Sequence, residues 1–192
     1  MRKVALMAAA IGLAALALRP ARADGVRKSP ELAIGLNNGG QALLSQYRGK
    51  VVVVAFILTY CPHCQKTIGI LSQMQNEYGP RGFQVLASAI EDNAKTAVPD
   101  FIKRFNPPFP VGFNNRDTAV EYLQHPSFLR FSMPQVVFVD KGGTIRSQYS
   151  GDDPFFADEI QTQMQNFRSK IEELLKEAPA VQKKAAAPKN KK

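Results

Sequence analysis

Apolar residues run without interruption through two segments that are bounded by turn residues. Val51 to Leu58 contains four consecutive valines, and Phe83 to Ile90 is the second run. A short continuous apolar run between turn residues is typical of a strand that is buried on both faces. The two runs therefore predict strands in the centre of a sheet that carries helices on each side.

Between these runs the apolar spacing changes to three and four residues, which predicts a helix. From Cys64 this spacing continues to Tyr78, and Gly79-Pro80 ends it. The same reasoning predicts further helices at 95–105, 118–123 and 155–176.

Shorter patterns fill the remainder of the chain. Residues 109–113 predict a short strand, and 135–139 and 144–149 predict a hairpin around the turn 140–143. Residues 24–41 are rich in Gly, Asn and Pro and predict an extended lead-in. The resulting order, β-α-β-α-β-α-β-β-α, indicates an α/β layered domain.

The formal net charge of +9 comes from the two ends of the chain. Four basic residues and no acid lie in the first 23 positions, five lysines lie in the last ten, and the part between is neutral overall. The charge pattern therefore gives no support to a nucleic-acid partner.

The first segment has the pattern of a secretory signal. Arg2 and Lys3 precede an apolar run over 4–18, and Ala21-Arg22-Ala23 fits the small-x-small cleavage rule. We expect a signal peptide at 1–23 and periplasmic export. An uncleaved anchor is the alternative, but the run is short for a membrane span.

The chain that follows the expected signal peptide divides into a domain and a tail. The domain covers 24–178, and 179–192 is an Ala/Lys/Pro-rich basic tail for which we expect disorder. We interpret the tail mainly as a solvated run of charges. Weak attraction to an anionic membrane surface is the alternative.

Cys61 and Cys64 are the only cysteines, and they stand where a buried strand meets a helix. A helix N-terminus favours the thiolate of the first cysteine, and the second lies one turn later, where it can attack a mixed disulfide. Pro62 suits the first helical turn, and His63 adds a titratable cation. The pattern predicts a redox-active pair in an oxidising compartment.

Two other uses of such a pair are less well supported. A structural disulfide this short removes little chain entropy, about 2 kcal/mol in the loop model. A zinc site needs four ligands, and His125 is the only histidine besides His63. No cofactor is expected.

The chain from about Ala42 to Leu175 resembles the thioredoxin superfamily, and within it the periplasmic TlpA/ResA-like and AhpC/TSA-type redoxins. The segments 44–52, 56–64, 109–111 and 133–143 carry the resemblance. Ile57 and Tyr60 depart from it, because tryptophans are usual there, and so does Gln135, where threonine is more frequent. The resemblance implies a thioredoxin-like fold with a central mixed sheet, flanking helices and a βα insertion after the active-site helix.

The resemblance also implies further site residues. Pro134 would have a cis bond and face the cysteines, and the backbone of Met133 would contact the substrate. An acid after the second core strand would assist Cys64. Alignment leaves Glu91 and Asp92 open, and we favour Asp92.

These residues predict a thiol–disulfide oxidoreductase that acts on protein thiols and is recycled by an unidentified redox partner. The Pro62-His63 dipeptide resembles that of DsbA-like oxidants, whereas the scaffold resembles proteins that mostly reduce. A peroxiredoxin is one alternative, although Thr59 stands two rather than three residues before Cys61. A Sco-like copper protein is another, although that group uses C-x-x-x-C.

Overall fold

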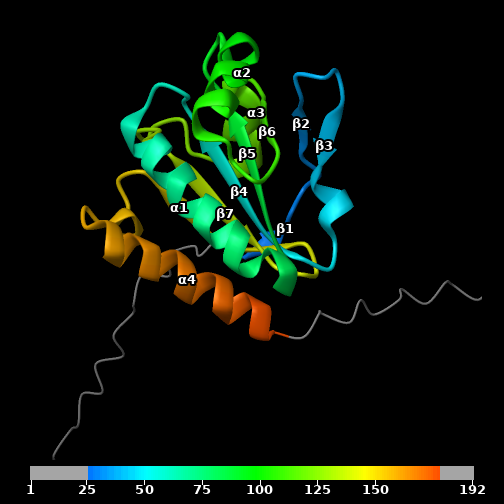
Figure 1. Cartoon of the computed structure of the whole chain (residues 1–192), viewed down its shortest axis with the longest axis vertical. Coiled ribbons are helices and arrows are strands. Elements are labelled where there is room, and N and C mark those ends of the chain that lie inside the picture. The colour runs from blue at the N-terminus through cyan, green and yellow to red at the C-terminus, as the bar shows by residue number, and fades with distance from the viewer. Residues whose placement is uncertain (1–25, 178–192) are drawn as a thin grey trace, which may run out of the picture.

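The two apolar runs form the central pair of strands in the computed structural model, which describes residues 26–177 (Figure 1). β4 (Val51–Ile57) and β5 (Phe83–Ala89) are parallel and pair residue for residue along their whole length. Every residue of β4 is buried, as expected for a strand that is covered on both faces.

Other strands extend the sheet on both sides of this pair. β7 (Gln135–Val139) lies antiparallel to β4 and forms a hairpin with β8 (Thr144–Ser150), whereas β6 (Val111–Phe113) is parallel to β5. These strands form the middle of a mixed eight-stranded sheet, in the order β8-β7-β4-β5-β6.

The expected extended lead-in instead forms three short strands. β1 (Arg27–Lys28) pairs with β8, and β2 (Ala33–Gly35) and β3 (Gln41–Leu43) form a hairpin beside β6. Each strand has only two or three residues, which is too short to show an apolar pattern, and β1 and β2 also pair with strands that are distant in the sequence.

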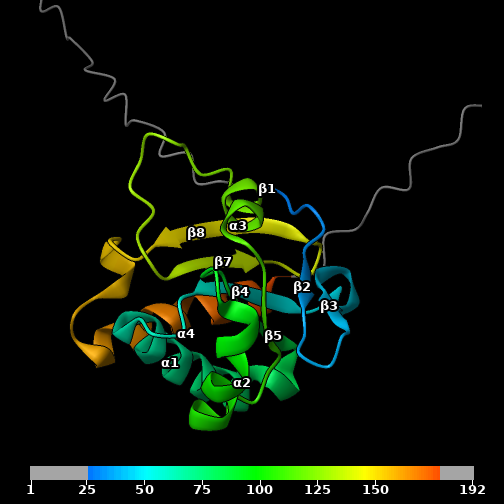
Figure 2. The ribbon, with the colours of Figure 1, turned by 90° about the horizontal axis from the view of Figure 1, so that it is seen from above.

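Helices cover both faces of the sheet (Figure 2). α1 (Pro62–Tyr78), α2 (Ala94–Phe105) and α4 (Ile160–Lys176) lie on one face, and α3 (Arg116–Leu123) lies on the other. Alternate residues of β4 divide between the two core clusters, so the strand separates them. This layered arrangement is the predicted α/β architecture.

The last helix begins later than the expected residue 155. Asp153 caps a short 3-10 turn, Pro154–Phe156, by accepting the backbone N–H of Phe155 at 2.8 Å. The Phe155 ring stacks on Tyr149 with a centroid distance of 4.0 Å. The helix itself begins at Ile160.

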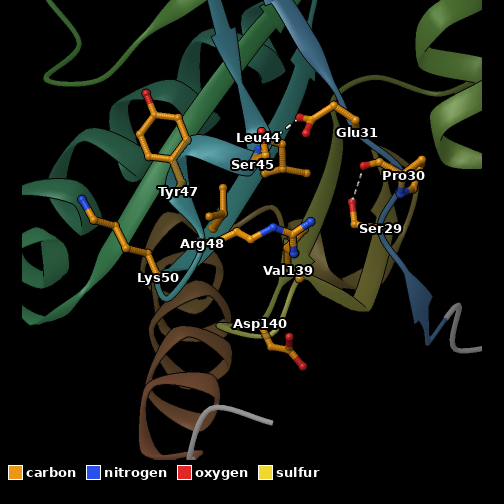
Figure 3. A pocket seen from close by; sticks show the side chains of 12 residues that line it. Ser29, Pro30, Glu31, Leu44, Ser45, Tyr47, Arg48, Lys50, Val139 and Asp140 are labelled. Atoms are coloured by element: carbon orange, nitrogen blue, oxygen red, sulfur yellow. Dashed lines mark hydrogen bonds between the residues drawn. The ribbon is translucent and has the colours of Figure 1, made fainter. Parts of the chain in front are cut away.

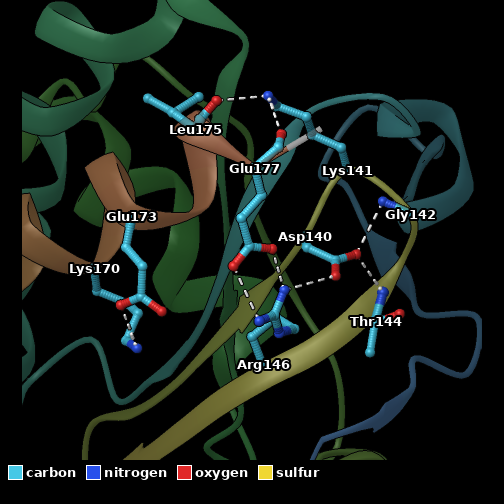
Figure 4. Close-up of polar contacts among 9 residues, drawn as sticks. All are labelled: Asp140, Lys141, Gly142, Thr144, Arg146, Lys170, Glu173, Leu175 and Glu177. Atoms are coloured by element: carbon cyan, nitrogen blue, oxygen red, sulfur yellow. Dashed lines mark hydrogen bonds and ion pairs between the residues drawn. The ribbon is translucent and has the colours of Figure 1, made fainter. Parts of the chain in front are cut away.

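A polar network joins the end of α4 to the β7–β8 turn (Figure 4). Asp140 accepts the backbone N–H groups of Gly142 and Thr144, each at 2.9 Å, and also pairs with Arg146. Arg146 in turn pairs with Glu177. The network fixes α4 at the end of the sheet where β4 begins.

The predicted signal peptide at 1–23 and the tail at 179–192 lie outside the described residues. Within 26–177, no helix has the length and apolar character needed to cross a membrane.

Candidate active site

Cys61 is the N-cap of α1, and a three-residue loop joins it to β4. Its backbone N–H donates to the carbonyl of Leu58 at 3.1 Å, and its own carbonyl accepts the N–H of Gln65 at 3.0 Å. Pro62 occupies the first helical position, where it has no hydrogen bond to lose. The loop therefore sets the first cysteine at the positive end of the helix.

The two cysteines are free thiols with different exposure. Cys61 is half-buried, whereas Cys64 is fully buried. The Cys64 sulfur accepts the backbone N–H of Leu58 at 3.4 Å. Burial raises the pKa of the Cys64 thiol strongly, and the neighbouring Cys61 and the charge of Glu91 raise it further, although the Leu58 N–H opposes them. Cys64 therefore holds its proton at neutral pH.

The side chains beside Cys61 face solvent. His63 is exposed, and Tyr60 has 68% of its surface accessible. The interaction of an exposed imidazolium with a thiolate is weakened by screening.

The Met133–Pro134 bond is cis, as the resemblance implied. Gln135 pairs with Phe56, so Pro134 precedes β7 at the end of the sheet where β4 leads to the cysteines. Buried Gln135, which stands where threonine is usual, donates to the carbonyl of Ser132 at 2.6 Å and to Ser150 Oγ at 2.9 Å. These bonds hold the segment that leads to the cis bond.

The carboxylate next to the cysteines is Glu91, not the favoured Asp92. Ile90 donates its N–H to the carbonyl of Ile57 at 3.1 Å, which continues the β5–β4 pairing and places Glu91 next to the active-site loop. Glu91 Oε1 accepts both the backbone N–H of Thr59, at 3.0 Å, and its hydroxyl. Asp92 is exposed.

The two carboxylate oxygens of Glu91 have different surroundings. Oε2 is buried and has no hydrogen-bond partner among the described residues. Glu91 also borders an open cleft of about 530 Å³ that includes Asp92 and Asn115. The carboxylate thus lies between the active-site loop and a solvent-accessible opening.

Two residues of the site were not identified from the sequence. Thr59 positions Glu91, and Gln65 on α1 donates to the Thr59 carbonyl at 2.8 Å. The sequence signal that could have identified Thr59 is its place, as a polar residue between an apolar strand and the cysteines.

A second cavity, of about 60 Å³, lies at the other end of β4 (Figure 3). Its lining includes Lys50, which precedes that strand, Val52 near its start, and Asp140 from the turn after β7. It is therefore separate from the cysteines. No group of three or more His, Cys, Asp or Glu side chains within 26–177 is arranged to hold a metal ion.

Known proteins similar to this chain include thiol–disulfide oxidoreductases. The thiol-disulfide oxidoreductase ResA of Geobacillus kaustophilus is 26% identical over 124 residues, which are 64% of this chain and 67% of that protein. ResA of Bacillus cereus ATCC 10987 is 21% identical over 145 residues, which are 76% and 77% of the two chains.

Solved structures show the same fold. A candidate DsbE thiol:disulfide interchange protein from Chlorobium tepidum superposes with a TM-score of 0.62 at 25% identity, over 76% of this chain and 96% of that one. A secreted Mycobacterium tuberculosis disulfide oxidoreductase has a TM-score of 0.56 at 17% identity, over 72% and 95%. The Redoxin family model matches residues 27–163. The chain thus belongs to the Redoxin family, within the thioredoxin superfamily, and has distant thiol–disulfide oxidoreductase homologues of the ResA and DsbE kind.

Proposed function

We propose that this protein is an exported oxidoreductase that exchanges disulfides with protein thiols through Cys61-Pro62-His63-Cys64. The unequal exposure of the two cysteines carries the proposal. Half-buried Cys61 can meet a client protein, whereas buried Cys64 can meet only Cys61. This division suits an exchange in two steps.

In the reducing direction, the Cys61 thiolate attacks one sulfur of a client disulfide. A Cys61–client disulfide forms, and the other client sulfur leaves as a thiolate that takes up a proton. Cys64 then attacks the sulfur of Cys61, and its proton passes to Glu91. The second client sulfur leaves as a thiolate that takes up a proton from solvent, and the protein holds a Cys61–Cys64 disulfide. The oxidising direction is the reverse.

Glu91 is the proton acceptor that we propose for Cys64. Its contact with Thr59, the free Oε2 and the electrostatic coupling to Cys64 support this role. The adjoining cleft would return the proton to solvent. We assign the backbone of Met133, which precedes the cis bond, to contact with the client chain.

His63 adjusts the redox balance in this proposal. A protonated imidazole near Cys61 stabilises the thiolate, which exists only in the reduced form, and so makes the disulfide a stronger oxidant. In this proposal residues 1–23 direct export to the periplasm and are removed in the process, and a separate redox partner restores the working state. Mass spectrometry of protein from the periplasmic fraction tests removal, and a chain that retains Met1 contradicts it.

Trapping tests the division of labour. Cys64→Ala should accumulate a mixed disulfide on Cys61 when the reduced protein meets a disulfide-bonded client, because resolution is lost. Cys61→Ala is the matched variant and should accumulate little, since Cys64 is buried. Equal trapping by both variants would reject the proposed roles.

A further inference from the structure

A cleft of about 200 Å³ adjoins the active-site loop and is distinct from the opening beside Glu91. Thr59 and Tyr60, the two residues before Cys61, form one side together with Gln65 of α1, and α2 forms the other. Figure 1 shows α2 at the end of the sheet where α1 begins. A client joined to Cys61 must therefore pass close to this cleft.

The α2 side of the cleft is aromatic. Phe101 and Phe105 are one helical turn apart, with ring centroids 4.6 Å from each other. Phe101 is buried and Phe105 half-buried. Ala97, a turn earlier, also lines the cleft and leaves space because its side chain is short. Tyr60, 68% exposed, provides an aromatic wall opposite.

The charged residues of the cleft carry opposite signs. Asp100 and Arg104 both line it and are both exposed, so it has no net charge. The Arg104 guanidinium lies 5.2 Å from the Phe105 ring centroid. A neutral side chain with a large apolar surface fits these walls better than a charged group does.

The volume of the cleft also limits the size of the group that can bind in it. Sites for small molecules generally span about 300–1,000 Å³, so a cleft of about 200 Å³ has room for one large side chain rather than a cofactor. Adjacent residues of an extended chain are about 3.3 Å apart along the strand. A side chain near the client cysteine can therefore reach the cleft while the sulfurs are bonded.

We propose that the cleft between Tyr60 and α2 is a specificity subsite that accepts a large apolar side chain within two residues of the client cysteine. The inference rests on the proposed exchange function and adds a substrate class to it. Clients with an aromatic or long aliphatic residue beside the cysteine are favoured over clients with small polar flanks.

Paired peptides test this proposal. Each peptide carries one cysteine as a mixed disulfide with glutathione. The two peptides of a pair differ at one position, which holds phenylalanine in one and serine in the other, and the pairs scan the two positions before and the two positions after the cysteine. Reduction by wild-type protein should be about tenfold faster for phenylalanine at one or more positions, a factor typical of apolar pocket discrimination. Ala97→Leu fills the cleft and should bring this ratio close to one.

Controls separate the subsite from the chemistry. Tyr60→Ser removes an exposed wall and should also lower the ratio, which provides a test if Ala97→Leu does not fold. Lys103→Gln lies on α2 outside the lining and should retain the wild-type ratio. The subsite proposal is overturned if wild-type protein reduces the phenylalanine and serine peptides at similar rates at every position. It is also overturned if both cleft variants keep the wild-type rate ratio. Failure to react with any disulfide, oxidised glutathione included, would instead overturn the proposed function.

Discussion

Thr59 donates both its backbone N–H and its hydroxyl to the same oxygen of Glu91. This contact joins the loop after β4 to the residues after β5 and leaves the other carboxylate oxygen buried without a partner. In the proposed mechanism, the contact orients Glu91 for the proton of Cys64.

Glu91→Gln should slow the resolving step about 100-fold at pH 7, near the lower end of the usual effect of general acid–base groups. The step is followed as decay of the glutathione adduct on Cys61, by quenched mass spectrometry after reduced protein meets oxidised glutathione. Loss of the Glu91 charge lowers the pKa of Cys64. A faster decay in Glu91→Gln would therefore mean that charge, not proton transfer, dominates.

Thr59→Val should slow the same decay, because it removes the hydroxyl that orients Glu91. Thr59→Ser should recover most of the rate, and the rate difference from wild type should shrink at alkaline pH, where hydroxide replaces the base. Asp92→Asn is the control on the adjacent exposed acid and should behave as wild type. Equal rates for the Val and Ser variants would exclude a positioning role.

His63→Ala should make the protein more reducing by about 10–20 mV, since a pair of exposed charges contributes less than about 1 kcal/mol and 30 mV corresponds to about 1.4 kcal/mol. Equilibration with glutathione in low and high salt measures the change. The shift should be smaller in high salt, because salt screens the interaction between exposed charges. A shift that salt leaves unchanged would assign the effect to something other than charge.

The reduced protein should lose stability as pH rises above about 8.5, the ordinary pKa of cysteine. Because folding raises the pKa of Cys64, its contribution is fully present below that pH. The unfolded chain loses the proton first, so the free energy of unfolding falls by about 1.4 kcal/mol per pH unit. Urea unfolding of reduced protein at pH 8, 9 and 10 measures this slope, and reduced Cys64→Ala should lack that part of it.

Asp140→Ala should reduce the free energy of unfolding by about 1–3 kcal/mol, because it leaves two backbone N–H groups of the turn and Arg146 without their acceptor. Asp140→Asn should cost less, since an amide oxygen can still accept from the turn. Glu173→Gln breaks an exposed pair with Lys170 and should cost under about 0.5 kcal/mol. A cost for Asp140→Ala no greater than that of Glu173→Gln would show that the turn network does not stabilise the fold.

The central elements could be predicted because their signals are local. β4 and β5 end one residue before their apolar runs do, and α1 ends at Tyr78 before Gly79-Pro80. The N-terminal strands could not be predicted in this way. β1 and β2 depend on distant partners, since Arg27 pairs with Ile145 and Gly35 with Phe113. The hairpin of β2 and β3 is local, but its strands have only three residues each and show no apolar pattern.

The choice between Glu91 and Asp92 shows a similar limit. Side chains alternate in direction along a strand and its continuation, so a shift of one residue exchanges the inward and outward acid. The bond from Ile90 to Ile57 sets that position, and it depends on pairing between strands. The cysteines needed no such information because a strand followed by C-x-x-C and a helix is a local signal.

The strand that leads to Cys61 forms ladder bonds with β5 on one side and β7 on the other. Its amides should exchange with deuterium only when the whole domain opens, whereas the loop that follows can open by local fluctuation. Oxidation and reduction should therefore change deuterium uptake after Ile57 at constant global stability and leave uptake within Val51–Ile57 unaltered. When the two redox forms have equal global stability, the difference in deuterium uptake between them should begin where the sheet ends.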